Sequence, residues 1–383
     1  MLIKNVILET MSAAKTIRGG WILCENGKIV ALGEGDAPEY SGEIIDGKGL
    51  SALPGFIDAH THLGIVEDSL DFEGDDCNED SEPATPQLRA LDAINPFDRC
   101  FAEARAAGIT CAAVAPGSAN PIGGQICVIK TAGRCVDEMV VEPYAAMKFA
   151  FGENPKNTYH AKNLSPVTRM ATAAIIRETL YKAQKYLEEL NRSKEEEDYD
   201  PPEYDFKNES MIPLLEGRAA AHFHAHRADD ICTALRTARE FDLKPVIVHA
   251  TEGHLIGDIL SGVACIAGPN LCDRSKPELK NQTFTNPAAL HAAGAELALT
   301  TDHPVSPLNY LTLCAALAKK NGLSRENAIA AVTLNPARIL GISERVGSLE
   351  VSKDADIVLV EGDILSLDSA VKAVYINGER ADI

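Results

Sequence analysis

The stretch "LPGFIDAHTHLG", residues 53–64, places His60 and His62 where an apolar run ends. A Pro-Gly pair precedes Phe56, which favours a strand that begins after a turn. Side chains at i and i+2 of a strand point to the same face, close enough to share one ligand. The pair therefore predicts two imidazoles that project together from a strand end, with Asp58 on the same side. A polar strand end is the alternative interpretation, and the rest of the chain decides between the two.

Composition and charge limit the class of protein. The 383 residues are 45% apolar and 24% charged, as in a globular protein with a large core. A net charge of −20 argues against nucleic acid and anionic membranes as partners. No apolar window is long enough for a membrane-spanning helix, and the N-terminus alternates like a strand instead of a signal peptide. Ten scattered cysteines without a C-x-x-C favour buried thiols. We expect a cytoplasmic protein that acts on a small molecule, and a homo-oligomer is left open.

Apolar runs alternate with helical periodicity through the middle of the chain. In residues 229–241 the apolar positions recur at i, i+3, i+4 and i+7, and Asp229 is a candidate N-cap. Alternating units of this kind imply parallel strands, and eight of them imply a (β/α)8 barrel, an α/β fold with its chemistry at the C-terminal strand ends. An open doubly wound sheet is the alternative. The eight runs are "GFIDAH", "GITCAAVAP", "QICVIKTA", "AAMKFAFG", "RAAAHFHAH", "KPVIVHA", "ACIAG" and "ELALTTDHP".

The two ends of the chain have a different sequence pattern from the middle. Residues 1–53 and 346–383 read as short strands with turns, which predicts one small sheet domain assembled from both termini. The barrel domain is then expected at 54–345. Near 160–212 a long amphipathic helix leads into an acidic, proline-bearing segment, and we interpret it as a helical acidic insertion in the barrel.

Residues of the types that bind metals lie at the ends of several separate apolar runs. Structural histidines would scatter over helices and loops, whereas these gather at strand ends, as a metal site at a barrel mouth requires. The sequence therefore predicts a metal centre. The residues are His60 and His62 in one run, His222, His224 and His226 in another, His249 in a third and Asp302 in the eighth.

Several motifs together resemble the amidohydrolase superfamily of metal-dependent hydrolases, and within it the imidazolonepropionase and Xaa-Pro dipeptidase-like branch. They are "PGFIDAHTHLG", the strand-end histidines, "TTDHP" and "TLNPARILG", while "GSLEVSKDADIVLV" resembles part of that superfamily's composite β-sandwich. The resemblance covers nearly the whole chain. It implies a (β/α)8 barrel with a small β-sandwich and one or two divalent metals.

The resemblance also implies a ligand set. "HAHRADD" resembles the "HAH" of dipeptidase-like members, which makes His224 the strand-five ligand, although a shift of one pleat would exchange it with His222 or His226. Imidazole and carboxylate ligands suit zinc, and manganese or iron would fit as well. The implied metal ligands are His60, His62, Lys148, His224, His249 and Asp302.

Lys148 enters this set through the carboxylated lysine with which binuclear members bridge two metals. It is the only lysine in "AAMKFAFGENPK" that fits strand four. Burial favours the neutral amine, the form that combines with carbon dioxide. The alternatives are a lysine paired with an acid, and Glu153 as the ligand.

The predicted activity is metal-dependent hydrolysis of an amide-type C–N bond, in a dipeptide, an N-acyl amino acid or a cyclic amide. A metal-activated hydroxide would attack, and Asp302 would carry the proton to the leaving amine. One alternative is a deaminase of a heterocyclic amine, but the acid that deaminases place shortly after the strand-five histidine is missing, as is the deacetylase motif H-L-E-G-P. A non-catalytic scaffold relative is the other alternative, although every expected ligand position is filled.

Three further residues are predicted to bind substrate. His226 follows the strand-five ligand, Arg227 could hold a carboxylate through two parallel hydrogen bonds, and His254 lies just past the strand-six ligand. An ion pair of Arg227 with Asp229 or Asp230 is its alternative role.

Overall fold

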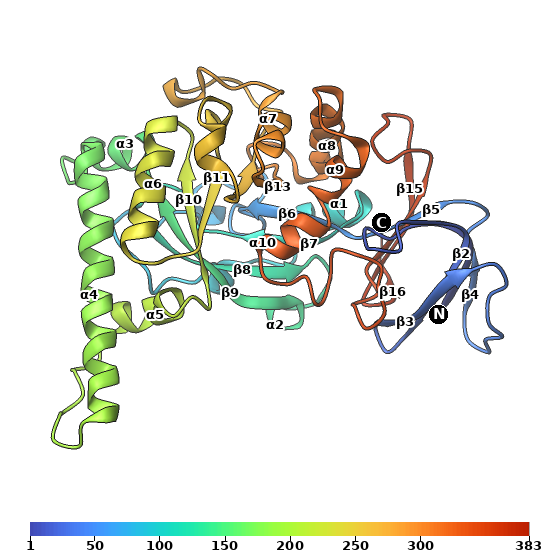
Figure 1. Ribbon diagram of the computed structural model, residues 1–383, viewed down its shortest axis with the longest axis horizontal. Helices are drawn as coiled ribbons and strands as arrows, with labels where there is room; N and C mark the ends of the chain where they lie inside the picture. Colours follow the sequence, from blue (N-terminus) through green and yellow to red (C-terminus); the bar gives the residue numbers. More distant parts are fainter. Residues whose placement is uncertain (383) are drawn as a thin grey trace.

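The computed structural model describes residues 1–382, which form a barrel with a smaller sheet beside it (Figure 1). All eight predicted runs are strands of the barrel sheet, in sequence order around it. The predicted fold class is therefore confirmed. The strands are β6 (Phe56–Thr61), β7 (Ile109–Val114), β8 (Ile122–Lys130), β9 (Val140–Ala150), β10 (Ala220–Ala225), β11 (Pro245–His249), β12 (Ala264–Ala267) and β13 (Glu296–Leu299).

Strand β8 departs from the parallel arrangement that alternating units imply. It runs antiparallel to both β7 and β9, whereas the other paired neighbours are parallel. The physical reason is the short connection through residues 115–121. A parallel return needs a crossover of a dozen or more residues, and a shorter connection brings the chain back antiparallel.

The barrel nearly closes between β6 and β13. The backbone N–H of His62 donates to the His303 carbonyl at 2.8 Å, just beyond the end of β13.

Most of the helices lie outside the strands (Figure 1), and the apolar sides of the helices and sheet form one large core. The helices are α1 (Arg99–Ala106), α2 (Val136–Met139), α3 (Glu153–Ala161), α4 (Arg169–Glu195), α5 (Phe206–Leu215), α6 (Ala228–Glu240), α7 (Asn286–Ala292), α8 (Leu311–Lys320), α9 (Arg325–Ala330) and α10 (Leu334–Ile339).

Two of these helices bear on the sequence-based expectations. Helix α6 begins one residue before Asp229, so its N-cap is Arg227 and Asp229 lies in the first turn. Helix α4 spans 27 residues, begins with a Thr168 side chain that accepts from Ala171 N, and projects well beyond the barrel (Figure 1). Within residues 1–382, no helix combines the length and the apolar character needed to cross a membrane.

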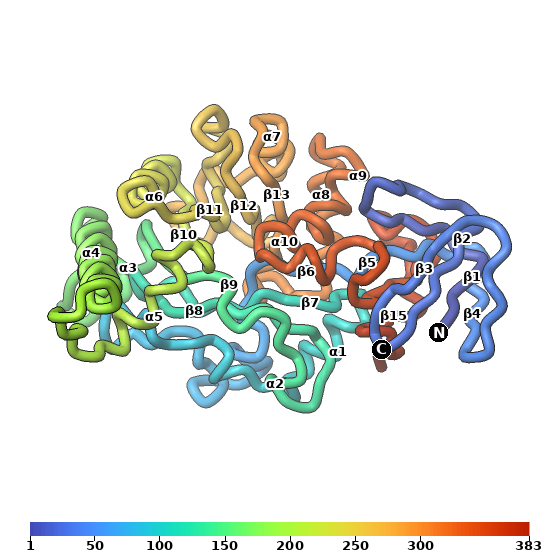
Figure 2. The backbone as a smooth tube through the Cα atoms, turned by 60° about the horizontal axis from the view of Figure 1, so that its bottom comes forward, coloured from blue at the N-terminus to red at the C-terminus, as the bar shows by residue number. Residues whose placement is uncertain are grey.

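The smaller sheet takes strands from both ends of the chain, which gather at one end of the molecule, opposite α4 (Figure 2). The ends meet where β5 pairs antiparallel with β14. The division of the chain into domains at the stated residues remains a prediction. The strands are β1 (Leu2–Glu9), β2 (Thr16–Glu25), β3 (Lys28–Glu34), β4 (Ile44–Asp46), β5 (Ser51–Pro54), β14 (Ile357–Glu361), β15 (Ala370–Ile376) and β16 (Glu379–Arg380).

A buried ion cluster joins the barrel to this sheet. Lys130, at the end of β8, places Nζ 2.6 Å from Asp356 Oδ2 and 3.1 Å from Asp354 Oδ2. Both carboxylates precede β14, and Lys28 of β3 also reaches Asp354, at 2.6 Å. Buried charges of opposite sign must stay paired, so this cluster fixes one part of the fold against the other.

Candidate metal centre

The predicted ligands from β6, β9 and the segment after β13 meet at the barrel mouth. Lys148 Nζ lies 3.1 Å from His60 Nε2 and donates to the Pro116 carbonyl at 3.0 Å. Asp302 Oδ1 lies 3.7 Å from His60 Nε2 and 3.6 Å from His62 Nε2. All four side chains are buried or nearly so. Two strands and the segment after a third thus bring nitrogen and carboxylate atoms close together.

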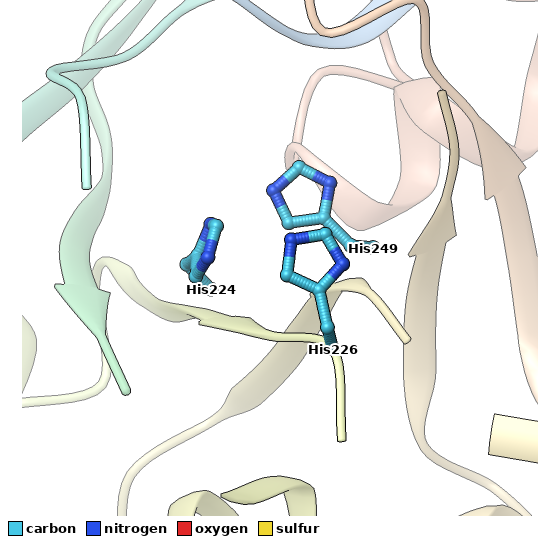
Figure 3. Close-up of side chains that lie close together, drawn as sticks. All are labelled: His224, His226 and His249. Atoms are coloured by element: carbon cyan, nitrogen blue, oxygen red, sulfur yellow. The ribbon is translucent and has the colours of Figure 1, made fainter. Parts of the chain in front are cut away.

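Three more histidines lie close to one another (Figure 3), and the ring of one of them, His249, lies 5.8 Å from that of His60. The rings of His226 and His249 stack with centroids 4.4 Å apart and an angle of 7° between their planes, and the His224 ring lies 4.5 Å from that of His249. Ligand atoms of these three histidines lie within 4.8 Å of one another, and the same holds for His60, His249 and Asp302. His249 therefore stands between two groups of candidate ligands.

Hydrogen bonds fix which ring nitrogen faces the centre. His62 Nδ1 donates to the Ala115 carbonyl at 2.7 Å, and His249 Nδ1 donates to the Gly268 carbonyl at 2.8 Å. A carbonyl oxygen can only accept, so both Nδ1 atoms carry hydrogen and both Nε2 atoms keep a free lone pair. This is the tautomer that a metal-binding imidazole needs.

Burial keeps these imidazoles neutral. Burial, with a smaller contribution from the charge of Lys148, lowers the pKa of His62 and of His249 to about 3. Burial also raises the pKa of Asp302, while the opposing charge of Lys148 holds it down. In the same site burial lowers the pKa of Lys148. Neutral imidazoles with free lone pairs and a carboxylate are the donors that a divalent metal such as zinc accepts, so the residues present fit the metal that the sequence predicts.

A buried carboxylate ties two ligand segments together, and two of the ligands have a left-handed backbone. His249 and Asp302 have φ values of 73° and 53°, in the left-handed region that non-glycine residues adopt at some free-energy cost, as Asp242 also does in a turn away from the site. Asp58 Oδ2 accepts from Thr301 N at 3.0 Å and from Thr301 Oγ1 at 2.6 Å, and its Oδ1 accepts from His60 N at 3.2 Å. Asp58 thus ties the end of β6 to the segment that carries Asp302.

A cavity of about 740 Å³ opens over this centre. Residues 117–119, from the glycine-rich loop after β7, form part of its wall. The volume falls within the range of about 300–1,000 Å³ that is usual for small-molecule sites. Other side chains that line it are His62, His224, His226, Asp302, Asn154 and Lys276.

Two of the three predicted substrate-binding residues do not line this cavity. Arg227 makes two hydrogen bonds with Asp229, at 2.9 and 2.8 Å, on the surface of α6. His254 Nδ1 is bonded to Asn286 Oδ1 at 3.2 Å. The structure therefore has the alternative role of Arg227, a surface ion pair. Arg227 is the N-cap of α6, so its side chain reaches the acids in the first turn of that helix more easily than it reaches the barrel mouth.

Two charged residues in the cavity region had no signal in the sequence. Glu278 is fully buried, and its Oε1 lies 3.7 Å from His224 Nε2, 3.5 Å from His226 Nε2 and 2.7 Å from Lys276 Nζ. Both residues belong to "SKPELKNQ", which resembles an ordinary charged surface loop. Only the folding of this loop over the barrel mouth reveals their position.

The structure also bears on the alternatives at strands four and five. Glu153 begins α3 and does not line the cavity, whereas Lys148 points toward His60. His222 pairs in register with Lys148, one pleat deeper than His224, and both of its ring nitrogens are buried without a hydrogen-bond partner. His224 and His226 both reach the cavity.

Comparison with known proteins agrees with this geometry. The fold is an α/β barrel with a histidine-rich candidate metal site at its mouth. The amidohydrolase family matches residues 51–381, and the chain belongs to that family. The family assignment made from the sequence is thereby confirmed.

Three similar proteins carry related names. An amidohydrolase from Thermotoga maritima MSB8 has a solved structure that is 39% identical, covers 100% of this chain and 99% of its own, and superposes with a TM-score of 0.96. The amidohydrolase tasK of Hapsidospora irregularis is 29% identical over 94% of this chain, which spans 39% of the length of tasK. An imidazolonepropionase from Symbiobacterium thermophilum is 24% identical over 92% of this chain and 86% of its own length.

Proposed function

We propose that this protein is a metal-dependent hydrolase of an amide-type C–N bond in a small molecule. The observation that carries the proposal is the position of Asp302. Its carboxylate lies 3.6–3.7 Å from two imidazole nitrogens and borders a cavity of about 740 Å³. A buried carboxylate beside neutral metal-type ligands, open to a cavity, is an arrangement suited to general acid–base catalysis.

The residues that would hold metal are those implied by the sequence, namely His60, His62, Lys148, His224, His249 and Asp302. A bound divalent metal would lower the pKa of a water molecule and polarise a carbonyl group. The chain's own contribution is to fix the ligand atoms before metal arrives, through the Ala115 and Gly268 carbonyls and through Asp58.

Asp302 would move the proton during hydrolysis. Burial raises its pKa above that of an ordinary aspartate, which makes the carboxylate a better base near neutral pH. Its Oδ1 would accept a proton from the attacking water and return it to the leaving amine nitrogen. Without that proton an amine is a poor leaving group, so the same side chain serves both halves of the reaction.

The substrate classes that we propose are a dipeptide, an N-acyl amino acid or a cyclic amide. Polar groups border the cavity on the side of α3, including Asn154, Ser118 and Lys276. They could orient a substrate by hydrogen bonds to its carbonyl or carboxylate groups. His226 also borders the cavity and remains our candidate for a substrate contact.

The test compares metal content and turnover in wild type and in the double variant His60→Ala, His62→Ala. Purified wild type should contain one to two equivalents of divalent metal and release amine from members of a dipeptide, N-acyl amino acid and cyclic amide panel. The double variant should lose at least one equivalent and all turnover. A matched control is His160→Ala, His291→Ala, which removes two exposed histidines and should change neither quantity.

Three results would contradict the proposal. Unchanged metal content in the His60→Ala, His62→Ala protein would show that these two histidines do not bind the metal and would refute the proposed centre. Ammonia release from a heterocyclic amine, with no turnover of any amide, would favour the deaminase alternative. A wild-type protein without metal and without turnover would favour the scaffold alternative.

A further inference from the structure

The cavity over the candidate centre has a single side chain that is cationic at any pH near neutral. Among the residues within 1–382 that border it, Lys276 is the only lysine or arginine. The acids that border it are Asp302, which belongs to the centre, and the exposed Asp273. Apart from a bound metal, an anionic group of a substrate therefore has one cation to meet in the cavity.

Two acceptors hold the ammonium of Lys276 and leave one of its donors free. Its Nζ lies 2.7 Å from Glu278 Oε1 and donates to Asn154 Oδ1 at 3.2 Å. A lysine ammonium has three N–H donors, so one is left for a further acceptor. The side chain is 27% exposed and borders the cavity, which is where that acceptor can enter.

Glu278 anchors this lysine in place. The carboxylate is buried, and its Oε2 accepts from Glu153 N, at the start of α3, at 3.1 Å. A helix N-terminus favours a negative charge. The backbone lies so close that a side chain at Gly152 would put its Cβ 2.6 Å from Oε2. Lys276 is thus positioned before a substrate binds, and the free-energy cost of ordering a long side chain does not weaken binding.

The distance from Lys276 to the centre fits a carboxylate close to the bond that would be cut. Glu278 Oε1 lies 2.7 Å from Lys276 Nζ and 3.5 Å from His226 Nε2, so the two nitrogens are at most about 6 Å apart. In an amino acid the amide nitrogen is about 2.5 Å from its own carboxyl carbon, and an ammonium binds a carboxylate oxygen at about 2.8 Å. A carboxylate held by Lys276 would therefore place its amide nitrogen about 5–6 Å from Nζ, beside the imidazoles.

We propose that Lys276 determines substrate specificity by binding a carboxylate on the carbon next to the scissile nitrogen. The inference rests on the proposed function and narrows it. An N-acyl amino acid and a dipeptide with a free C-terminus both carry this group, whereas a cyclic amide need not. Ser275 and Asn157 also border the cavity and supply further hydrogen-bond donors for the carboxylate oxygens.

The test uses pairs of substrates that differ only in the terminal group. Each N-acetyl amino acid or dipeptide is compared with its C-terminal carboxamide, and the ratio of the two kcat/KM values is measured on metal-loaded protein. Wild type should favour the carboxylate by about 10- to 100-fold, the contribution of a hydrogen bond between charged partners. In Lys276→Met the ratio should fall to about one.

The matched control is Lys280→Met, the same substitution at an exposed lysine of the same loop that does not border the cavity. It should keep the wild-type ratio. A second variant is needed because Lys276→Met leaves Glu278 buried without its lysine. The double variant Lys276→Met, Glu278→Gln removes both charges, and its ratio should also be about one.

The ratio also distinguishes specificity from a purely structural role of Lys276. A lysine that only neutralised Glu278 would lower kcat/KM equally for both members of a pair and leave their ratio unchanged. A wild-type ratio of about one would overturn the inference. So would a carboxylate preference that persists in Lys276→Met or in the double variant.

Binding measurements separate this inference from the function on which it rests. Calorimetry of the same pairs on Asp302→Asn protein, with and without Lys276→Met, reports carboxylate recognition without turnover. If no amide is hydrolysed but carboxylates bind more tightly than carboxamides only when Lys276 is present, the hydrolytic proposal fails and the carboxylate site stands. If amides are hydrolysed and both members of each pair bind equally, the hydrolase stands and the carboxylate site fails.

Discussion

Replacing Asp302 by asparagine should separate catalysis from metal binding. Asparagine has nearly the same size as aspartate and tolerates the left-handed backbone at this position, where φ is 53°. It keeps one oxygen for weak ligation but lacks basicity. The imidazole ligands of the centre are untouched by the change, so we expect the bound metal largely to remain.

Turnover should fall by about 10²–10⁴, the usual contribution of a positioned general acid–base group. At about 1.36 kcal/mol per factor of ten, this corresponds to roughly 2.7–5.4 kcal/mol of transition-state stabilisation. Inhibitor affinity should change much less, because the cavity wall is retained. The assay is amine release on the best amide of the panel, at equal metal content, with inhibitor dissociation constants measured in parallel.

The matched control is Asp242→Asn, the same substitution at the same φ of 53° in an exposed turn. It should leave turnover and metal content at wild-type values. Near-full turnover in Asp302→Asn would refute the reasoning and leave Asp302 as a structural ligand only. The proton would then have to pass through another cavity group, and His226 is the next to test.

Two other predictions concern buried lysines. Metal-loaded protein in ¹³C-labelled bicarbonate should show a carbamate carbon signal by NMR that Lys148→Met lacks. The reason is that burial favours the neutral amine, which combines with carbon dioxide. A signal in both proteins, or in neither, would contradict a carboxylated Lys148. Lys130→Met should lower the free energy of unfolding in urea by about 3–5 kcal/mol, because it leaves Asp356 buried without a cation, whereas Asp354 keeps Lys28 and Arg345. Lys28→Met is the control, since Lys28 is 45% exposed and its pair should contribute at most about 1 kcal/mol; an equal loss in both variants would contradict the role of the buried cluster.

The strands and most of the metal-type ligands could be predicted from the sequence because both leave a local signal. A barrel strand must be apolar over a few residues and then end in a turn, so all eight runs were visible in the chain. Histidines two apart at such an end share a face whatever the rest of the fold does. For His60 and His62 nothing beyond the period of a strand was needed.

Contacts between distant segments had no such signal, and the tertiary structure alone decided them. The approach of Glu278 to His226 depends on how a loop of ordinary composition folds over the barrel mouth. The direction of β8 follows from the length of its connection to β7. The ion pair of Arg227 with Asp229 follows from the residue at which α6 begins. Periodicity records which face a side chain takes within its own element. It carries no information about which distant charge lies opposite, because that is set by chain connectivity and by the packing of the whole barrel.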